Sequence, residues 1–511
     1  MHHLIREICY NEVYFQMSMH ANMYYFFMHM FIHAFDKRNL WHKMPVPIGL
    51  LYLNTRRTLL EKYNLLVVGS SHGALFDPKE FPYRTGDGKY NDPHNAEAGS
   101  QYTFFWRNMK PVDQQDELLA RREYKDTGKR FNILAVAWIQ FMIEIAAPKE
   151  VANECPLKSF KSAVYGNNEK HAKKIRTYDD GTLVIGDDGL LLHEENGVPL
   201  SGDVRNGWVG VLILHALFLR NTMQFEEHPN LSDEELYRYA KLVTFAVIAK
   251  IHTIDWTVEL LKTKIMKAAM HANWYGLLDK KIKYTFAHIG GTPISHGVPY
   301  SLTEEFTRVY RMYIDIGELV GLKGEDQLSK IGFEKQKLSM GYQACGALEL
   351  WNYPSFFRDL IPQNLDGTNR SDRTHLAALQ VYRDRERSVP RYNEFRRRVF
   401  LIPIKSWEDL TSDKDAIEAI RAIYGDDRKK IKGFSISETT FNIFIFNGIK
   451  VIFSSHRFIT SNFNEKTYTK KGMQWVKTTE GLRDVINRHY PEITANWMKF
   501  SSAFSMWDAN Y

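Results

Sequence analysis

Hydrophobic residues recur three and four positions apart along most of the chain from Phe131 onward. This spacing places them on one face of a helix, because an α-helix completes a turn every 3.6 residues. The segments with this pattern are residues 133–145, 208–219, 232–264, 302–313, 376–385, 415–423 and 437–446. We therefore predict a mainly α protein, built as one large helical domain with few short strands.

Two local signals refine this prediction. Ser232 is followed by three acidic residues, 233–235, which suits a helix start because the first main-chain amides of a helix lack partners. A short hairpin is expected at residues 182–193, with its tip at 186–189. The aspartates near that tip do not have the spacing of a twelve-residue calcium loop, which favours a solvated tip.

The N-terminal part differs from the rest. Residues 21–35 are rich in Met, Phe, Tyr and His but are too short and too polar to span a membrane. They suit either a helix lying on a membrane surface or a helical arm packed on the main body. We therefore divide the chain into a membrane-proximal arm (1–45) and a main domain (46–511). Residues 73–124 are predicted to be a long loop region.

Composition narrows the class of protein. The net charge of +7 is spread along the 511 residues, so no basic stripe indicates nucleic-acid binding. Three cysteines form neither a metal-binding spacing nor a disulfide framework, which favours a reducing compartment. With no secretory signal recognisable, we expect an intracellular protein that is cytosolic or bound peripherally to a membrane or lipid droplet.

A G-x-S-x-G pattern occurs at residues 69–73, after an apolar run. In a hydrolase such a nucleophile turn leads directly into a helix. Here Asp77 and Pro78 lead into the loop region instead. The hydrolase interpretation is therefore disfavoured.

A more informative segment surrounds His252. On a helix, His252, Asp255 and Trp256 share one face, and Thr257 follows about one and a half turns after His252. A histidine and a threonine so placed could donate two hydrogen bonds to an anionic ligand. The alternative is a core histidine that is hydrogen-bonded to its helical neighbours.

Two other segments carry candidate chemistry. Tyr310 lies in a helical pattern in which one face is apolar, and a buried tyrosine is its ordinary explanation. Residues 383–396 alternate arginines and acids before a proline and an aromatic residue. Such a stretch suits a salt-bridged surface turn or an anchor for acidic groups.

Several of these segments resemble the fatty-acid α-dioxygenases of plants, a family within the animal-type haem peroxidases. Residues 381–396 (VYRDRERSVPRYNEFR) are similar to the superfamily's Q-R-x-R-D-x-G-x-P-x-Y-N-x-x-R stretch, and residues 201–206 to its G-D-x-R-x-N. Residues 249–264, 272–278 and 296–305 resemble segments specific to the α-dioxygenases. The resemblance extends from about Trp41 to the C-terminus, with breaks, and implies a haem peroxidase-like helical fold.

The resemblance also implies an activity. In this family, haem b oxidised by peroxide generates a tyrosyl radical, which removes a hydrogen from C2 of a long-chain fatty acid; O2 then adds there to give the 2-hydroperoxy acid. Tyr310 is similar in position to the radical tyrosine of the family's V-Y-R-M-H motif. His252 and Thr257 match the pair that holds the substrate carboxylate. The implied protein is a monomer with a calcium site, and its products serve oxylipin formation and plant defence.

The sequence departs from the family at the haem pocket. Residues 138–143 (WIQFMI) are followed by Glu144, where the family continues with His-Asp-Trp and so supplies the distal histidine. The segment after residues 155–160 omits the family's calcium loop. Tyr313 stands where the family has the proximal histidine, and Lys450 stands near its missing carboxylate-binding arginine. Both are weak substitutes, and no calcium ligand is identifiable.

Two hypotheses account for these gaps. The chain is either a misassembled or partial translation of an α-dioxygenase gene, or an inactive relative that acts as a fatty-acid-binding or structural shell. The sharp boundaries of the gaps favour the first hypothesis.

Overall fold

A computed structural model describes the parts of the chain that form most of its helical core. The described residues are 23–63, 89–90, 131–146, 164–165, 169–186, 191–193, 200, 209–221, 231–275, 333–346, 360–361, 368–371, 373–376, 378–379, 382, 384, 389–424, 463–498 and 502–507. Within these ranges the structure is helical, with only isolated β-bridges. The prediction of a mainly α fold is confirmed.

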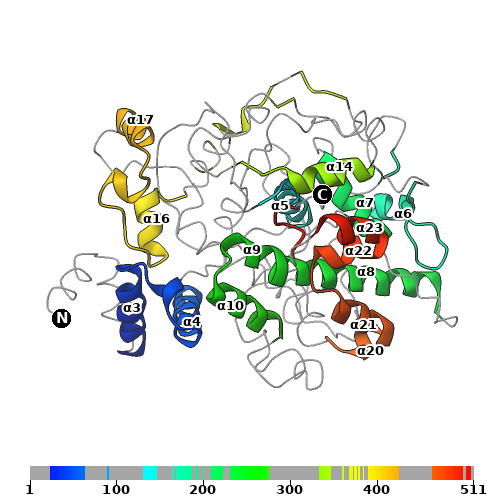
Figure 1. Ribbon diagram of the computed structural model, residues 1–511, viewed down its shortest axis with the longest axis horizontal. Coiled ribbons are helices and arrows are strands. Elements are labelled where there is room, and N and C mark those ends of the chain that lie inside the picture. Colours follow the sequence, from blue (N-terminus) through cyan, green and yellow to red (C-terminus); the bar gives the residue numbers. More distant parts are fainter. Residues whose placement is uncertain are drawn as a thin grey trace.

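Figure 1 shows α3, α4, α16 and α17 on one side of the molecule and most of the other described helices together on the other side. Their bounds are α3 (Met23–Asp36), α4 (Val46–Tyr63), α5 (Ile133–Ala146), α6 (Glu169–Lys174), α7 (Val209–Arg220), α8 (Asp233–Ile251), α9 (Thr257–Leu261), α10 (Lys264–Tyr275), α14 (Phe333–Tyr342), α16 (Tyr392–Arg398), α17 (Lys414–Tyr424), α20 (Glu465–Tyr468), α21 (Lys470–Thr478), α22 (Leu482–His489) and α23 (Pro491–Trp497). Short helical turns occupy Trp41–Lys43, His252–Trp256 and Trp407–Asp409.

The periodic segments form helices wherever the structure describes them in full. Residues 133–145, 208–219 and 415–423 correspond to α5, α7 and α17. The segment 232–264 is one long helical run that ends at Lys262, whose left-handed backbone (φ 45°) stops α9. The expected helices at 302–313 and 437–446 lie outside the described residues, as does most of the one at 376–385.

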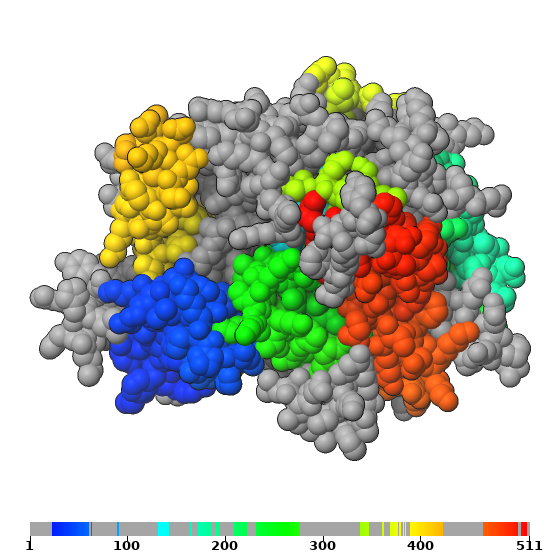
Figure 2. Space-filling view, in the orientation of Figure 1, coloured from blue at the N-terminus to red at the C-terminus, as the bar shows by residue number. Residues whose placement is uncertain are grey.

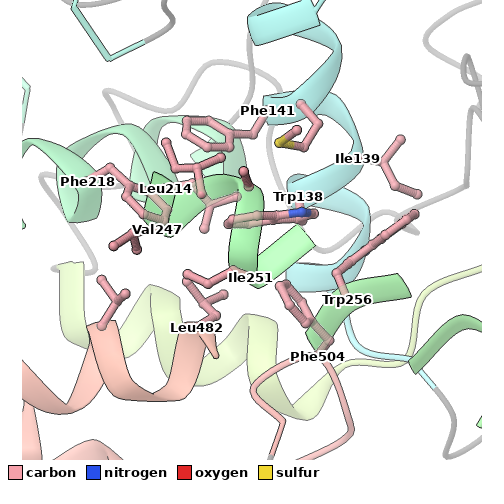
Figure 3. Packing of buried hydrophobic residues seen from close by; sticks show 14 of the residues in the cluster. Trp138, Ile139, Phe141, Leu214, Phe218, Val247, Ile251, Trp256, Leu482 and Phe504 are labelled. Atoms are coloured by element: carbon pink, nitrogen blue, oxygen red, sulfur yellow. The ribbon is translucent and has the colours of Figure 1, made fainter. Parts of the chain in front are cut away.

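The core forms where α5, α7, α8 and α22 meet. Helices α5 and α7 are apolar on all sides, which predicts helices buried all round. The rings of Phe141 and Phe218 stack across them with centroids 5.5 Å apart, and Trp138 lies beside both (Figure 3). Each such side chain, fully buried, stabilises the fold by about 1.5–3 kcal/mol. A smaller cluster joins α16 to α17 around Trp407.

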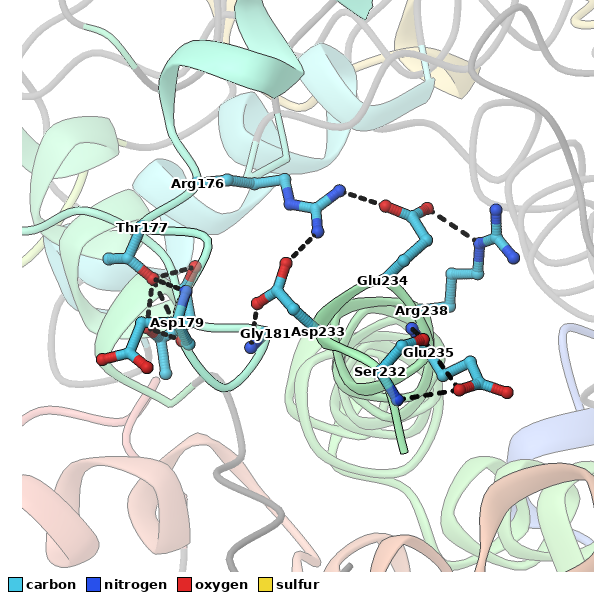
Figure 4. A network of polar contacts seen from close by, with 10 residues as sticks. Arg176, Thr177, Asp179, Gly181, Ser232, Asp233, Glu234, Glu235 and Arg238 are labelled. Carbon is cyan, nitrogen blue, oxygen red and sulfur yellow. Dashed lines mark hydrogen bonds and ion pairs between the residues drawn. The ribbon is translucent and has the colours of Figure 1, made fainter. Parts of the chain in front are cut away.

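Helix α8 begins as the sequence predicts. Ser232 caps it in a reciprocal arrangement with Glu235. The guanidinium of Arg176 pairs with Asp233 and Glu234 in the first turn of the helix (Figure 4). The acids are favoured there because they lie at the positive end of the helix dipole. This contact fixes the segment that follows α6 to the start of α8.

A tight turn lies at the start of the expected hairpin. Arg176 and Leu183 form an antiparallel bridge, and the turn between them contains Gly181 at φ +66°. The hairpin tip expected at residues 186–189 lies, apart from residue 186, outside the described residues. A Cβ at Gly181 would lie 2.4 Å from the main-chain nitrogen of Tyr237, so glycine is required where the turn meets α8. The aspartates Asp179 and Asp180 are exposed at its tip, as expected.

Helix α3, in the predicted N-terminal arm (1–45), packs against α4, and an exposed basic turn joins the two helices. Arg56 of α4 forms a buried ion pair with Asp36 of α3 and donates through Nε to Tyr52 over 3.0 Å. His29 of α3 packs edge-on against Phe400, after α16. Figure 2 shows α3 and α4 at one corner of the molecule, in blue. No helix among the described residues has the length and apolar character needed to cross a membrane.

Candidate functional site

The segment around His252 forms an irregular turn inside a long helix. After Ile251 the helix widens into a π-helical turn, η2 (His252–Trp256), before α9 begins. The main-chain N–H of Thr257 donates to the carbonyl oxygen of His252, five residues earlier. Residues five apart in an α-helix point about 140° away from each other, so the wider turn brings Thr257 back over His252. Turns of this kind are frequent at functional sites.

The ring of His252 is held by two tryptophans. Nε1 of Trp138, on α5, donates to Nδ1 of His252 over 3.1 Å. The Trp256 ring stacks on His252 with centroids 4.9 Å apart and planes 14° apart. Trp256 itself donates to the carbonyl oxygen of Ala135, also on α5, over 3.1 Å. The partner of Nδ1 is thus on another helix, and not among the helical neighbours that the core-histidine alternative invoked.

The electrostatics of this turn favour a neutral histidine. Burial lowers the pKa of His252 to about 3, because the charged ring would lose its hydration. Thr257 is also fully buried, and its hydroxyl donates to the carbonyl oxygen of His252 over 2.6 Å. A hydroxyl has one hydrogen to give. To donate to an anion, the Thr257 hydroxyl must turn its hydrogen away from the carbonyl oxygen of His252. That carbonyl would still accept the hydrogen bond from the main-chain N–H of Thr257.

Asp255 has a different role from the one its helical spacing suggested. Its carboxylate points to the start of α22, where the main-chain N–H of Leu482 donates to Oδ2 over 2.9 Å. A Cβ on Gly481 would lie 2.6 Å from the same oxygen, so this approach requires a glycine. Burial raises the pKa of Asp255 to about 7. Asp255 therefore joins the π turn to α22, while His252 and Trp256 face α5.

Of the other candidate residues, the structure describes only part of the arginine-rich stretch. Tyr310, Tyr313, Lys450 and the G-x-S-x-G segment lie outside the described residues. At the end of the arginine-rich stretch, Glu394 pairs with Arg397 and Arg398, which follow the stretch directly. Arg396 is instead buried and donates to the carbonyl oxygen of Ile402 over 2.7 Å.

Sequence reasoning missed Trp138 as a neighbour of His252. Trp138 lies in the WIQFMI segment. In the sequence, this segment was notable because the family's histidine is missing after Ile143. The indole nitrogen of Trp138 was the available signal, because a buried tryptophan N–H usually has an acceptor. Which acceptor it meets could not be read from the spacing.

Helix α5 carries the segment in which the resemblance places the distal side of a haem. The helix ends with Glu144, Ile145 and Ala146, so Glu144 stands where the family motif continues with histidine. Along the described ranges, no cluster of three or more His, Cys, Asp or Glu could hold a metal ion. Helix α5 therefore offers no histidine to the distal side of a haem.

Comparison with known proteins agrees with the family that the sequence motifs resemble. Residues 161–500 match the animal haem peroxidase family. The chain is 69% identical to "Alpha-dioxygenase PIOX" of Oryza sativa subsp. japonica over 590 aligned positions, covering 94% of this chain and 95% of that protein. It is 46% identical to "Alpha-dioxygenase 1" of Arabidopsis thaliana, covering 98% and 94%. Because 590 positions exceed the 511 residues of the chain, the rice protein has internal residues that are absent here.

Solved structures agree with this relationship. A crystal structure of a variant Oryza sativa fatty acid α-dioxygenase with palmitic acid has a TM-score of 0.87 at 66% identity, and the match covers 96% of this chain and 98% of that one. The Arabidopsis thaliana fatty acid α-dioxygenase has the same TM-score at 45% identity, covering 98% and 95%.

Proposed function

The chain belongs to the α-dioxygenases of the animal haem peroxidase family, and from this premise we propose that its π turn binds the carboxylate of a long-chain fatty acid. His252 and Thr257 would be the donors to that carboxylate. Tyr310 would lie beside C2 of the acid, from which the family's reaction removes a hydrogen. Palmitate is the probe of choice, because the rice relative was crystallised with palmitic acid.

One observation carries this proposal: the π turn brings a neutral, buried histidine and a buried threonine to the same face of one helix, one turn apart. In an apolar surrounding a hydrogen bond to an anion is stronger than in water, because water does not compete for it. Fixing the carboxylate also fixes C2, since C2 is bonded to the carboxyl carbon. Positioning of this kind is a large part of rate acceleration.

The proposed activity is oxygenation at C2, giving the 2-hydroperoxy acid. The test combines hemin titration in the Soret region with peroxide-dependent oxidation of palmitate. Tyr310→Phe is the matched control, because it removes the phenolic O–H and keeps the ring. A stoichiometric Soret band with oxidation lost in Tyr310→Phe would support the enzyme. Palmitate oxidation that persists in Tyr310→Phe would exclude a Tyr310 radical.

A second function is favoured by the Glu144 position on α5: a fatty-acid-binding shell without redox activity. It predicts saturable binding of labelled palmitate with no specific haem band. Binding should weaken in His252→Gln and Thr257→Val. Absence of saturable binding by the intact protein would overturn both functions. Sequencing of the source transcript provides a separate test of the missing segments, since a His-Asp-Trp after Ile143 would indicate a misassembled chain.

We also propose that the N-terminal pair of helices rests on a lipid surface. Met23 and Phe27 of α3 and Leu51 of α4 have 71%, 62% and 55% of their surface exposed. The turn between the helices adds exposed basic residues, Lys37 and Lys43 among them. An apolar face with a basic border suits the boundary of an anionic membrane.

Sedimentation with vesicles tests this surface. Vesicles of phosphatidylcholine and phosphatidylserine should carry down the wild type more strongly than pure phosphatidylcholine vesicles. Phe27→Ser combined with Leu51→Ser should reduce the bound fraction several-fold. Leu192→Ser, which changes an exposed leucine elsewhere, is the control and should bind like the wild type. Equal binding by all three proteins would refute the surface.

A further inference from the structure

The contact between Trp138 and His252 determines where the imidazole hydrogen lies. An indole nitrogen has a hydrogen to donate and cannot accept. Nδ1 of His252, 3.1 Å from Nε1 of Trp138, is therefore the acceptor of this bond. A neutral imidazole carries its single hydrogen on the other nitrogen. The hydrogen of His252 thus lies on Nε2.

The surroundings keep both rings in this orientation. Trp138 is fully buried and packs against Phe141, Phe218 and Phe504, with centroids 5.4–5.8 Å away (Figure 3). Trp256 covers one face of His252 and is itself bonded to α5. Rotation of the imidazole by 180° would place the Cδ2–H group opposite the indole and leave the indole N–H without this acceptor, and close packing opposes such rotations.

We infer that Trp138 is a positioning residue that makes Nε2–H of His252 the donor to an anionic ligand. This inference rests on the proposed fatty-acid function for the identity of the ligand. In the other tautomer Nε2 would turn a lone pair toward the carboxylate, and two acceptors repel each other. Donation by the indole to Nδ1 also favours the neutral ring, since a protonated Nδ1 could not accept it.

The wild-type protein gives the first test. Nitrogen-15 spectra of the histidine-labelled protein distinguish a nitrogen that carries hydrogen from one that does not, and the His252→Gln variant assigns the signals. We expect the Nε2–H form to predominate and the ring to stay neutral at pH 6. A ring with its hydrogen on Nδ1, or an equal mixture, would overturn the inference without any change at Trp138.

Three tryptophan variants give the second test. Trp138→Phe should produce a mixture of tautomers and raise the pH at which His252 protonates. Trp256→Phe keeps the indole donor and should keep the Nε2–H form. Trp407→Phe removes an equally buried tryptophan from the separate cluster near α17 and controls for lost packing. An unchanged tautomer in folded Trp138→Phe would overturn the inference.

Palmitate affinity connects the tautomer to function. At pH 8, Trp138→Phe should bind palmitate about twofold more weakly than Trp407→Phe, because an equal mixture of tautomers leaves roughly half of the protein with a donor at Nε2. In a His252→Gln background the two tryptophan variants should bind palmitate alike, because no imidazole tautomer remains to be fixed. An unchanged ratio in that background would indicate a merely structural role and contradict the inference. If the wild type shows the Nε2–H form but binds no palmitate, the positioning by Trp138 is supported and the proposed function fails.

Discussion

The ammonium of Lys250, on α8, donates to the main-chain carbonyl oxygen of Val476, at the end of α21, over 2.9 Å. It also pairs with Glu480 over 3.1 Å, and Tyr275 donates to the other oxygen of that carboxylate. The last carbonyls of a helix lack partners within it. The buried Lys250, just before the π turn, thus provides a hydrogen-bond donor for a carbonyl at the end of α21 and fixes α21 to α8.

Lys250→Met should therefore destabilise the fold although methionine fills similar space. The substitution leaves the carbonyl of Val476 without its lysine partner, and such a loss at a buried group costs about 1–3 kcal/mol. Urea titration measures the free energy of unfolding. Lys267→Met, at an exposed position on α10, is the control and should change it by under about 0.5 kcal/mol. Equal effects of the two substitutions would contradict the capping role.

The pKa of Asp255 predicts a stability that changes with pH. Its folded pKa of about 7 lies above the value of roughly 3.9 in an unfolded chain. Between these values the folded protein holds a proton that the unfolded chain has released, so this group's contribution falls as pH rises from about 4 to 7. Asp255→Asn has no such proton. Its unfolding free energy relative to wild type should therefore improve between pH 5 and pH 7.5, and a constant difference would refute the raised pKa.

His252 contributes the opposite trend. Its folded pKa of about 3 lies below the roughly 6.5 of an unfolded histidine. As pH falls from 6.5 toward 3, the unfolded chain takes up a proton that the folded ring refuses, and stability is lost. His252→Gln should flatten this acid-side loss. Urea titrations of wild type and variant at pH 4.5 and 7.5 measure it, and parallel losses would indicate that His252 already carries a charge.

Thr257 allows binding to be separated from folding. Thr257→Val removes the hydroxyl, but His252 keeps the main-chain N–H of residue 257, so stability should fall by only about 1 kcal/mol. Palmitate affinity should fall about tenfold, because one donor to the carboxylate is lost. Thr257→Ser restores the hydroxyl and should restore most of the affinity. If the valine and serine variants bind alike, the hydroxyl does not contact the ligand.

The buried ion pair of Arg56 and Asp36 should hold α3 against α4. Arg56→Met leaves the Asp36 carboxylate buried without its partner, and breaking such a pair costs about 3–5 kcal/mol. Hydrogen exchange should rise in α3 and α4 and stay unchanged in α22. The double variant Arg56→Met with Asp36→Leu should recover much of the loss. Equal exchange in wild type and Arg56→Met would show that packing of His29 on Phe400 suffices.

The sequence by itself determined the parts of this protein that depend on near neighbours. The all-round apolar character of α5 and α7 predicts buried helices, and Ser232 with Glu235 predicts the start of α8, because both signals act within a few residues. The family motifs likewise indicated the α-dioxygenases, as the comparisons confirm.

Only the tertiary structure decided the partners of the site. Trp138 lies 114 residues from His252, and Leu482 lies 227 residues from Asp255. The π turn also changes which side chains align, bringing Thr257 over His252 where α-helical spacing separates them. Helical periodicity specifies the face on which a donor or acceptor lies. Which distant segment packs on that face depends on the fit of the whole core, and that fit decides the hydrogen bonds of His252.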